Sequence, residues 1–190
     1  MLERRSAMAT LLANRPKNMF VVPGLGSTTW DAMAAGDDDR NFYLWGAMGG
    51  AAMIGLGLAL AKPELRVAVI TGDGEMLMGL GSLATVGVQR PGNLSIVVFD
   101  NRMYGETGMQ ASHTASGVDL CSVARACGIE RVLDVKDEEA LQALAQLMAK
   151  SNRTLFARVL ISPEDPPRVL PEKDGVTIKD RVRRAVAAIG

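Results

Sequence analysis

The sequence predicts an α/β protein, built as a doubly wound parallel sheet with helices on both faces. Short runs of β-branched residues alternate with longer segments of helical period, which is typical of parallel α/β sheets. The runs 67–71 and 94–99 are almost wholly apolar, as strands must be when helices cover both sides of a sheet. A chain of 190 residues suits one domain with a sizeable core.

The expected elements follow from the period of the apolar residues and from turn signals. We expect helices over 1–14, 27–35, 47–61, 75–88, 119–127, 138–150 and 178–188, and strands over 19–22, 67–71, 94–99, 131–135 and 154–161. Residues 100–117 show no period, and a long loop inside a compact domain is usually functional. Residues 163–175 are rich in proline and acidic residues. We therefore expect a domain over 1–162 and a C-terminal arm with a helix over 163–190.

The composition excludes several classes of protein. Twenty-one basic side chains balance twenty-one acidic ones, whereas a nucleic-acid binder needs a basic surplus. Cys121 and Cys127 match neither a disulfide framework nor a CxxC motif, and the single histidine, His113, excludes a histidine-rich metal site. The most apolar stretch, 47–61, is too short to span a bilayer. We expect a cytoplasmic protein that binds neither nucleic acid nor membrane.

The turn Gly72-Asp73-Gly74 follows one central run, and Asp100-Asn101 follows the next. Ligands bind at the carboxyl edge of open α/β sheets, so Asp73 and Asn101 share a crevice if the two strands are neighbours. Carboxylate and amide oxygens suit Mg²⁺, which commonly keeps phosphate oxygens in its shell. The amides of Gly74 and Glu75 open the next helix, and a helix N-terminus favours a diphosphate. The pattern therefore indicates a magnesium–diphosphate site.

Two side chains of the loop 100–117 are candidates for acid–base chemistry. Histidine exchanges a proton readily near neutral pH, so His113 suits proton transfer or the binding of an anionic substrate. A solvated or structural histidine is the alternative. Glu106, in the same loop, is the second candidate.

Two other interpretations compete with the diphosphate site. Gly79, Gly81 and Ala84 match a relaxed dinucleotide-binding fingerprint. However, Gly79 lies well past the preceding strand, inside the expected helix, where Gly79 and Gly81 permit close packing of helix on sheet. A non-catalytic subunit of the same fold is the other interpretation, and it predicts the loss of Asp73 or Asn101, both of which are present.

The motifs resemble those of the thiamine-diphosphate-dependent enzymes, which carry GDG and, after about the same interval, NN, here Asp100-Asn101. The segment 45–49 resembles the WGS-apolar-G segment of the 2-oxo-acid decarboxylases in that family. Residues 78–85 and 104–108 resemble the β subunits of sulfopyruvate decarboxylases and the corresponding half of phosphonopyruvate decarboxylases. The resemblance extends over residues 19–159 and implies the thiamine-diphosphate-binding fold.

The resemblance implies thiamine diphosphate and Mg²⁺ as cofactors. It implies Asp73, Asn101 and the backbone carbonyl of Met103 as metal ligands. In the family, the carbonyl at the position of Gly46 accepts a hydrogen bond from the aminopyrimidine, and the apolar residue at Met48 supports the bent cofactor. The whole implied cofactor site comprises Gly26, Ser27, Gly46, Met48, Gly72, Asp73, Gly74, Glu75, Asn101, Met103 and Tyr104.

The resemblance also implies an activity and a partner. The activity is the non-oxidative decarboxylation of a small 2-oxo acid, such as one with a sulfo or phosphono group, to an aldehyde. Carboligation of the acetolactate-synthase type is the alternative. The family's activating glutamate lies on a separate pyrimidine-binding domain, for which 190 residues leave no room. We therefore expect a β subunit that works in a hetero-oligomer, with a pyrimidine-binding α subunit supplying that glutamate.

Overall fold

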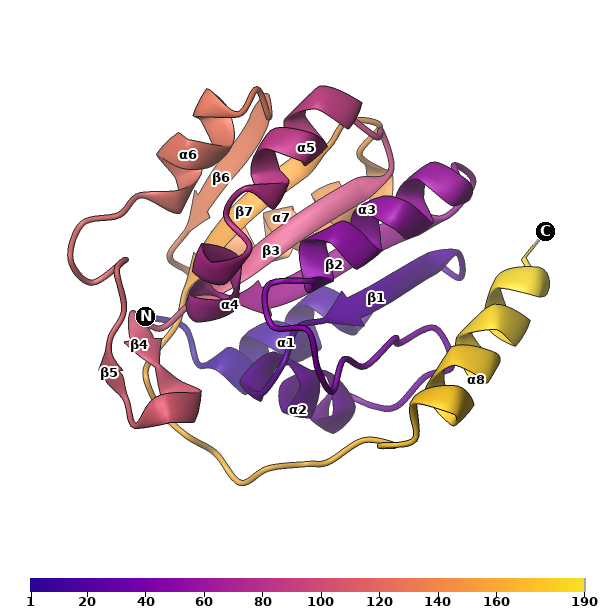
Figure 1. The fold of residues 1–190 in the computed structure, drawn as a ribbon, viewed down its shortest axis with the longest axis horizontal. Coiled ribbons are helices and arrows are strands. Elements are labelled where there is room, and N and C mark those ends of the chain that lie inside the picture. The colour runs from indigo at the N-terminus through magenta and orange to yellow at the C-terminus, as the bar shows by residue number, and fades with distance from the viewer. Residues whose placement is uncertain (190) are drawn as a thin grey trace.

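The computed structural model describes residues 1–189 and has a five-stranded parallel sheet at its centre (Figure 1). The strand order is β1 (Met19–Pro23), β2 (Arg66–Gly72), β3 (Leu94–Asp100), β7 (Leu155–Leu160) and β6 (Arg131–Val135), so the doubly wound α/β fold predicted from the sequence is confirmed. From β3 the chain passes to the edge strand β6 and then returns to β7, which lies between them. All four pairings in this sheet are parallel, so all five carboxyl ends of the strands meet at one edge.

The bounds of the elements are close to those expected. The helices are α1 (Arg4–Leu12), α2 (Ser27–Ala34), α3 (Ala51–Ala61), α4 (Asp73–Met78), α5 (Ser82–Gln89), α6 (Leu120–Ala126), α7 (Glu138–Lys150), α8 (Gly175–Ala187) and the 3₁₀ turn η1 (Gly105–Thr107). The strands are β1 (Met19–Pro23), β2 (Arg66–Gly72), β3 (Leu94–Asp100), β4 (Met103–Tyr104), β5 (Gln110–Ala111), β6 (Arg131–Val135) and β7 (Leu155–Leu160).

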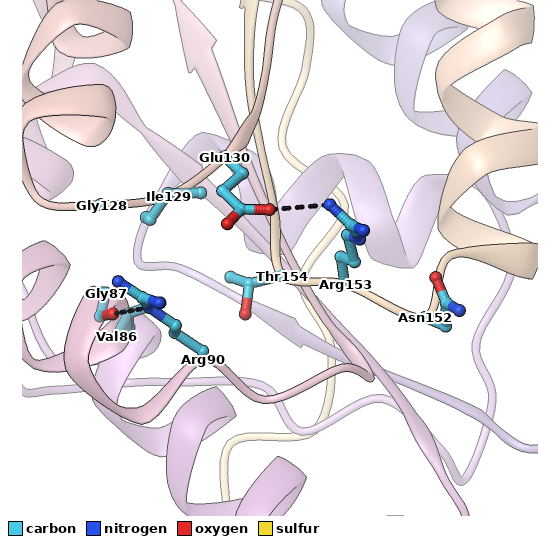
Figure 2. A pocket seen from close by; sticks show the side chains of 9 residues that line it. All are labelled: Val86, Gly87, Arg90, Gly128, Ile129, Glu130, Asn152, Arg153 and Thr154. Atoms are coloured by element: carbon cyan, nitrogen blue, oxygen red, sulfur yellow. Dashed lines mark hydrogen bonds and ion pairs between the residues drawn. The ribbon is translucent and has the colours of Figure 1, made fainter.

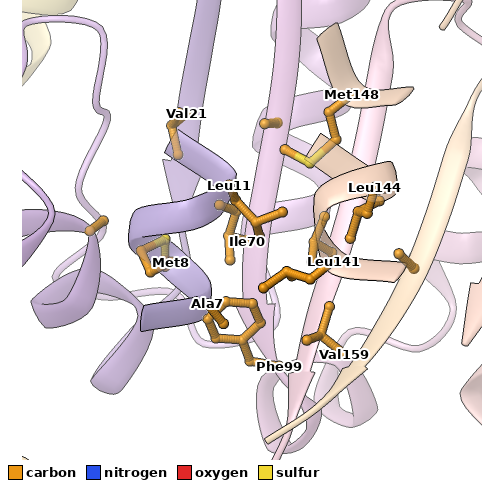
Figure 3. Close-up of a cluster of buried hydrophobic side chains, with 14 of the residues drawn as sticks. Ala7, Met8, Leu11, Val21, Ile70, Phe99, Leu141, Leu144, Met148 and Val159 are labelled. Atoms are coloured by element: carbon orange, nitrogen blue, oxygen red, sulfur yellow. The ribbon is translucent and has the colours of Figure 1, made fainter. Parts of the chain in front are cut away.

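Each face of the sheet buries its own core, because side chains of a strand alternate between the two faces. In β2, Ala68 and Ile70 pack with α1 and α7 in one cluster (Figure 3). Val67 and Val69 pack on the other face, in a cluster that includes residues of α3, α5 and α6. Helices therefore cover both faces, which explains why the central strands are apolar throughout.

Two of the expected helices depart from the prediction at glycines. The helix expected over 75–88 is interrupted between α4 and α5, at residues 79–81. The prediction that Gly79 and Gly81 pack a helix on the sheet was wrong: a Cβ at Gly79 would lie 2.3 Å from the carbonyl oxygen of Gly49, and a Cβ at Gly81 would meet no atom within 4 Å. The helix expected over 47–61 begins only at Ala51, because Ala47 and Gly49 have φ of 60° and 88°.

The loop expected over 100–117 contains a small antiparallel hairpin of β4 and β5, joined by η1. It projects from the carboxyl edge of the sheet (Figure 1).

After β7 the chain runs along the outside of α2 and ends in α8 (Figure 1). Arg5 donates to the carbonyl oxygen of Pro167 at 2.7 Å, and the indole of Trp45 donates to that of Glu172, also at 2.7 Å. Arg181 of α8 forms an ion pair with Asp37 at 2.9 Å. Among residues 1–189, no helix has the length and apolar character needed to cross a membrane.

Candidate active site

A cavity of about 250 Å³ opens at the carboxyl edge of the sheet. The residues around it come from the ends of β2 and β3, from the starts of α1 and α2, from the β4–β5 hairpin and from the C-terminal arm. They include Arg4, Ser27, Trp30, Met48, Gly72, Asp73, Gly74, Glu75, Asn101, Met103, Tyr104, Glu106, Asp165 and Arg168. Ten of the thirteen residues expected in the site lie here.

Asp73 and Asn101 share this cavity because β2 and β3 are neighbours in register. Gly72, the last residue of β2, is paired with Phe99 of β3. Asp73 therefore emerges beside Asp100 and Asn101. The Asp73 side chain is only 2% exposed, and Asp100 is fully buried. The sheet thus holds two carboxylates and one amide at a single point.

Two hydroxyl groups from the loop after the hairpin hold these carboxylates. Ser112 donates to Asp73 Oδ2 at 2.5 Å, and Thr114 donates to Asp100 Oδ1 at 2.8 Å. Both hydroxyl residues are buried. Sequence reasoning missed Ser112 and Thr114, because they lie far along the chain from Asp73 and belong to no motif. Two hydroxyl residues flanking His113 in a loop after the Asp100-Asn101 motif were the only available signal.

The electrostatics of the pair fit a divalent cation. Burial, and then the nearby charge of Asp100, raise the pKa of Asp73 to about 6 despite the hydrogen bonds from Ser112 and Thr114. Asp100 Oδ2 is buried without a hydrogen bond, and Arg158 lies 3.8 Å from it. Buried negative charge is costly unless a cation offsets it. A carboxylate, the Asn101 amide oxygen and a backbone carbonyl at Met103 form the oxygen set that Mg²⁺ prefers.

The donor set explains why no cluster of acids marks the site. Within residues 1–189, no group of three or more His, Cys, Asp or Glu side chains is placed to hold a metal ion. A site built from one carboxylate, one amide and one backbone carbonyl contributes only Asp73 to such a group. The Asn101 amide oxygen also accepts from the backbone N–H of Met103 at 2.9 Å, which fixes its direction.

The start of α2 forms a further wall of the cavity. Gly26 has φ of +72°, a conformation that favours glycine. Thr28 and Thr29 both donate to the carbonyl oxygen of Gly24, at 3.0 and 2.7 Å, while Ser27 lines the cavity. The N-terminus of an α-helix attracts phosphate oxygens, so Ser27 and the first amides of α2 fit a diphosphate.

Glu75 lines the cavity but its carboxylate is directed into the protein. Glu75 Oε2 accepts from the backbone N–H of Leu25 and from the hydroxyl of Thr71, both at 2.9 Å. Burial raises the pKa of Glu75 above its usual value, against the hydrogen bond from Thr71. The residue thus connects the start of α4 to the turn before α2. It supports from behind the wall of the cavity that the start of α2 forms.

Of the two residues expected in the site from the segment 45–49, Gly46 and Met48, only Met48 lies at the cavity. Met48 lines it and is 42% exposed. Gly46 is exposed and does not line the cavity. Gly26 does not line it either, but it lies against Glu106: a Cβ at Gly26 would be 2.4 Å from Glu106 Oε1.

The two acid–base candidates differ in position. Glu106 lines the cavity from η1. His113 is exposed and outside the lining, with its ring against the edge of Tyr104, the two ring centres 5.9 Å apart. Tyr104 itself lines the cavity, so His113 contacts the site through this ring. Sequence reasoning also missed four residues that line the cavity, Arg4 and Trp30 and, from the arm, Asp165 and Arg168.

A second cavity, of about 190 Å³, lies at the amino edge of the sheet (Figure 2). Its charged groups already have partners: Glu130 and Arg153 form an ion pair at 2.8 Å, and Arg90 donates to the carbonyl oxygen of Gly87 at 2.9 Å. Thr154 donates to the carbonyl oxygen of Pro91. The candidate active site is the cavity at the carboxyl edge, which holds Asp73 and Asn101.

Comparison with known proteins decides the family. The model of the C-terminal TPP binding domain of thiamine pyrophosphate enzymes matches residues 27–159. The chain belongs to this family. Thiamine diphosphate is therefore the cofactor, and the dinucleotide-binding interpretation is wrong. The physical reason is visible in the structure, where Gly79 follows α4 rather than β2.

The relatives of this thiamine pyrophosphate-binding chain differ in length. Phosphonopyruvate decarboxylase from Streptomyces viridochromogenes is 44% identical over 153 residues, which are 80% of this chain and 38% of the relative. Sulfopyruvate decarboxylase subunit beta from Methanothermobacter thermautotrophicus is 37% identical over 186 residues, 98% of this chain and 96% of the relative. The chain thus spans little more than a third of the first relative and nearly all of the second.

Solved structures show the same fold. Benzoylformate decarboxylase from Polynucleobacter necessarius superposes with a TM-score of 0.69 at 21% identity, over 87% of this chain and 34% of that one. The thiamine pyrophosphate-binding fold expected from the sequence is confirmed.

Proposed function

We propose that this chain is the β subunit of a two-component enzyme that decarboxylates a small 2-oxo acid, of the sulfopyruvate or phosphonopyruvate kind, to an aldehyde. The observation that carries the proposal is the meeting of Asp73 and Asn101 in one cavity with the start of α2. A relative of nearly the same length is named a sulfopyruvate decarboxylase subunit beta. The named substrates of the relatives support the class of 2-oxo acid.

Several residues of the cavity have distinct tasks in this proposal. Asp73, Asn101 and the Met103 carbonyl hold Mg²⁺, and Ser27 with the first amides of α2 binds the diphosphate. Met48 offers an apolar surface to the ring system of the cofactor. Glu106 lines the cavity with an ionisable group and exchanges a proton with the substrate. When bound, thiamine diphosphate supplies the nucleophilic carbon and the electron sink that a 2-oxo acid needs to lose CO₂.

The partner completes the site. Of the glutamates at this cavity, Glu75 is committed to Leu25 and Thr71, and Glu106 lies against Gly26 at the diphosphate wall. A pyrimidine-binding α subunit supplies the glutamate that activates the cofactor. The apolar side chains of Met48, Met78 and Met109 line the cavity and are 42, 66 and 42% exposed, and exposed apolar patches commonly mark protein interfaces.

Reconstitution tests this proposal. The purified chain is titrated with thiamine diphosphate and Mg²⁺ by calorimetry, and CO₂ release from sulfopyruvate, phosphonopyruvate and pyruvate is measured with and without the co-expressed α subunit. We expect the chain alone to bind the cofactor and to release no CO₂, and the complex to be active. Robust decarboxylation by the chain alone contradicts the two-component proposal, and failure to bind the cofactor contradicts the site.

A cytoplasmic location is the last part of the proposal. Cys121 and Cys127 are free thiols, which suits a reducing compartment. Burial raises the pKa of Cys121, so this thiol is kept in its unreactive protonated form.

A further inference from the structure

Arg4 brings a buried positive charge to the active-site cavity. Leu2 forms a parallel bridge with Ile161 just beyond β7, its N–H donating to the carbonyl oxygen of Leu160 at 3.2 Å. This pairing places the start of α1 at the carboxyl edge of the sheet. The Arg4 side chain is 4% exposed and lines the cavity.

Two nitrogens of this guanidinium, Nε and Nη2, lie in ion pairs but make no hydrogen bond. Arg4 Nε lies 3.3 Å from Asp31 Oδ2, and Nη2 lies 3.5 Å from Asp165 Oδ1. Neither nitrogen makes a hydrogen bond. Asp31 is shared with Arg5, also at 3.3 Å, and Asp165 is 69% exposed, so water weakens its attraction. A buried guanidinium with unmade hydrogen bonds is costly, and an anion that accepts them is stabilised.

Arg168 of the C-terminal arm is a second cation at the same cavity. Its guanidinium stacks 4.3 Å above the ring of Trp30, which also lines the cavity. Within residues 1–189 no carboxylate lies within ion-pair distance of it. Arg168 is therefore held in place by an aromatic face while its hydrogen-bond donors stay available.

The charge of the cavity makes these two residues necessary for an anionic substrate. Among the described residues, Arg4 and Arg168 are the only basic side chains that line it, against five acidic ones: Asp73, Glu75, Glu106, Glu164 and Asp165. A 2-oxo acid with a sulfonate or phosphonate carries at least two negative charges. Without local cations, such a substrate is repelled from an acidic cavity.

We propose that Arg4 and Arg168 bind the sulfonate or phosphonate tail of the substrate, and that Asp165 occupies this position when the substrate is absent. The proposal rests on the proposed function for the class of 2-oxo acid. The two guanidinium groups then distinguish a substrate with an anionic tail from pyruvate, which leaves their donors unpaired. The C-terminal arm is thereby part of the substrate site, since it supplies both Arg168 and the competing carboxylate.

Calorimetry on the full chain loaded with thiamine diphosphate and Mg²⁺ tests the proposal with unreactive probes. The probes are 3-sulfopropanoate and propanoate, which differ only in the sulfonate, with inorganic sulfate as a third. We expect 3-sulfopropanoate to bind about tenfold more tightly than propanoate or sulfate, as one charge-assisted hydrogen-bonded pair provides. R168Q and R4Q remove most of this preference, and R4K keeps part of it.

Asp165→Asn gives an effect of the opposite sign. Removing the competing carboxylate tightens 3-sulfopropanoate binding about threefold, because an exposed ion pair contributes less than about 1 kcal/mol. R102Q is the matched control, since Arg102 is an exposed arginine in the loop beside the cavity that does not line it. It leaves the preference unchanged.

Several outcomes overturn the proposal. The first is equal binding of 3-sulfopropanoate and propanoate by the unmodified chain, and the second is an unchanged preference in R168Q. Binding of sulfate as tight as that of 3-sulfopropanoate indicates a general oxyanion site and also overturns it. If R168Q and R4Q weaken the binding of thiamine diphosphate as much as they weaken the binding of 3-sulfopropanoate, the two residues hold the diphosphate instead. Because Arg168 is exposed, we expect R168Q to fold. Its binding of the probes can therefore be measured even if R4Q does not fold.

The outcomes for the proposed function are separate. Failure of the unmodified chain to bind thiamine diphosphate contradicts the proposed function. The preference for 3-sulfopropanoate, measured on the chain without cofactor, still reports on the two arginines in that case.

Discussion

The carboxylate of Glu75 accepts a hydrogen bond from the backbone N–H of Leu25 at 2.9 Å, across fifty residues of sequence. The same oxygen accepts from Thr71, so one side chain connects the end of β2 and the start of α4 to the turn before α2. The wall of the cavity at the start of α2, where we propose that the diphosphate binds, therefore depends on a residue whose carboxylate is directed into the protein.

Glu75→Ala tests this support. Two donors lose their acceptor, and each buried unsatisfied donor costs about 1–3 kcal/mol. We expect the free energy of unfolding to fall by about 2 kcal/mol and the Kd for thiamine diphosphate to rise about tenfold. Glu75→Gln keeps an acceptor and is milder. Glu64→Ala, at an exposed position, is the control in urea unfolding and calorimetry; an unchanged Kd in E75A contradicts the supporting role.

Asp73→Asn separates stability from function. Asp73 is buried beside Asp100, so the neutral amide relieves repulsion between two carboxylates in the chain without cofactor. We expect this form to gain about 1 kcal/mol of stability, because sites built for a ligand commonly cost stability in its absence.

The readout for Asp73→Asn is thermal unfolding with and without thiamine diphosphate and Mg²⁺. Ligands raise the melting temperature of the state that binds them, so the unmodified chain shifts upward and the variant does not. Asn101→Ala is expected to lose the same shift without the gain in stability. A variant D73N that keeps the full magnesium-dependent shift contradicts the metal role.

The sequence predicted the strands and the meeting of Asp73 with Asn101 in one cavity because both depend on local pattern. The apolar runs 67–71 and 94–99 and the turn Gly72-Asp73-Gly74 are read directly from the chain, and neighbouring parallel strands bring Asp73 and Asn101 together. The break at residues 79–81 was missed, since its cause is the approach of Gly49 from a distant segment.

The rest of the site depends on tertiary contacts that no local pattern carries. Ser112 and Thr114 reach the carboxylates only because the chain returns to the carboxyl edge of the sheet after the β4–β5 hairpin. Arg168 reaches the cavity because Trp30 and Arg5 hold the C-terminal arm. A segment rich in proline indicates an extended arm, but the contacts that the arm makes with the rest of the chain decide where it lies.

Acid is expected to release α8 before the rest of the fold. The Asp37 carboxylate accepts two hydrogen bonds from Arg181, at 2.9 and 3.0 Å, and one from the hydroxyl of Tyr43 at 3.0 Å. Burial alone raises the pKa of Asp37, but these hydrogen bonds outweigh it and hold the pKa below its usual value. Because the folded pKa lies below the unfolded one, the stabilisation is present above about pH 4 and is lost as the pH falls further.

Hydrogen exchange measures this release. We expect amides of α8 to exchange faster relative to those of α7 between pH 5 and pH 3, after correction for intrinsic rates. Asp174, which caps α8, also has a lowered pKa because of its hydrogen bond from Thr177, so acid removes both contacts. Asp37→Asn at pH 7 isolates the ion pair and is expected to cost about 1 kcal/mol locally. Uniform exchange across the chain contradicts the prediction.

Truncation after residue 162 tests the expected division into a domain over 1–162 and an arm over 163–190. Val182 of α8 packs on Phe20 and Leu65, which are each 1% exposed. We expect the truncated chain to fold cooperatively, with a free energy of unfolding about 2–4 kcal/mol lower, since two large apolar side chains become partly exposed. Urea unfolding measures this change. Loss of cooperative unfolding shows that the arm belongs to the domain core.

Alanine substitutions at Gly79 and Gly81 form a matched pair that tests how Gly79 supports the loop carrying Met48. A Cβ at Gly79 would lie 2.3 Å from the backbone oxygen of Gly49, whereas a Cβ at Gly81 meets nothing within 4 Å. Gly81 has φ of −60° and ψ of −21°, which alanine adopts readily. We expect Gly79→Ala to lower the free energy of unfolding by about 1–3 kcal/mol and Gly81→Ala to raise it by about 0.4–1 kcal/mol.

The displaced backbone in Gly79→Ala also affects the cofactor. Gly49 adjoins Met48, which lines the cavity, so a shift of Gly49 moves this apolar surface. We expect calorimetry to show weaker thiamine diphosphate binding in G79A and unchanged binding in G81A. If both variants bind equally well, the contact between Gly79 and Gly49 serves the fold alone. If G81A also weakens binding, residues 79–81 have to be flexible for the cofactor to bind, and a steric origin of the effect is excluded.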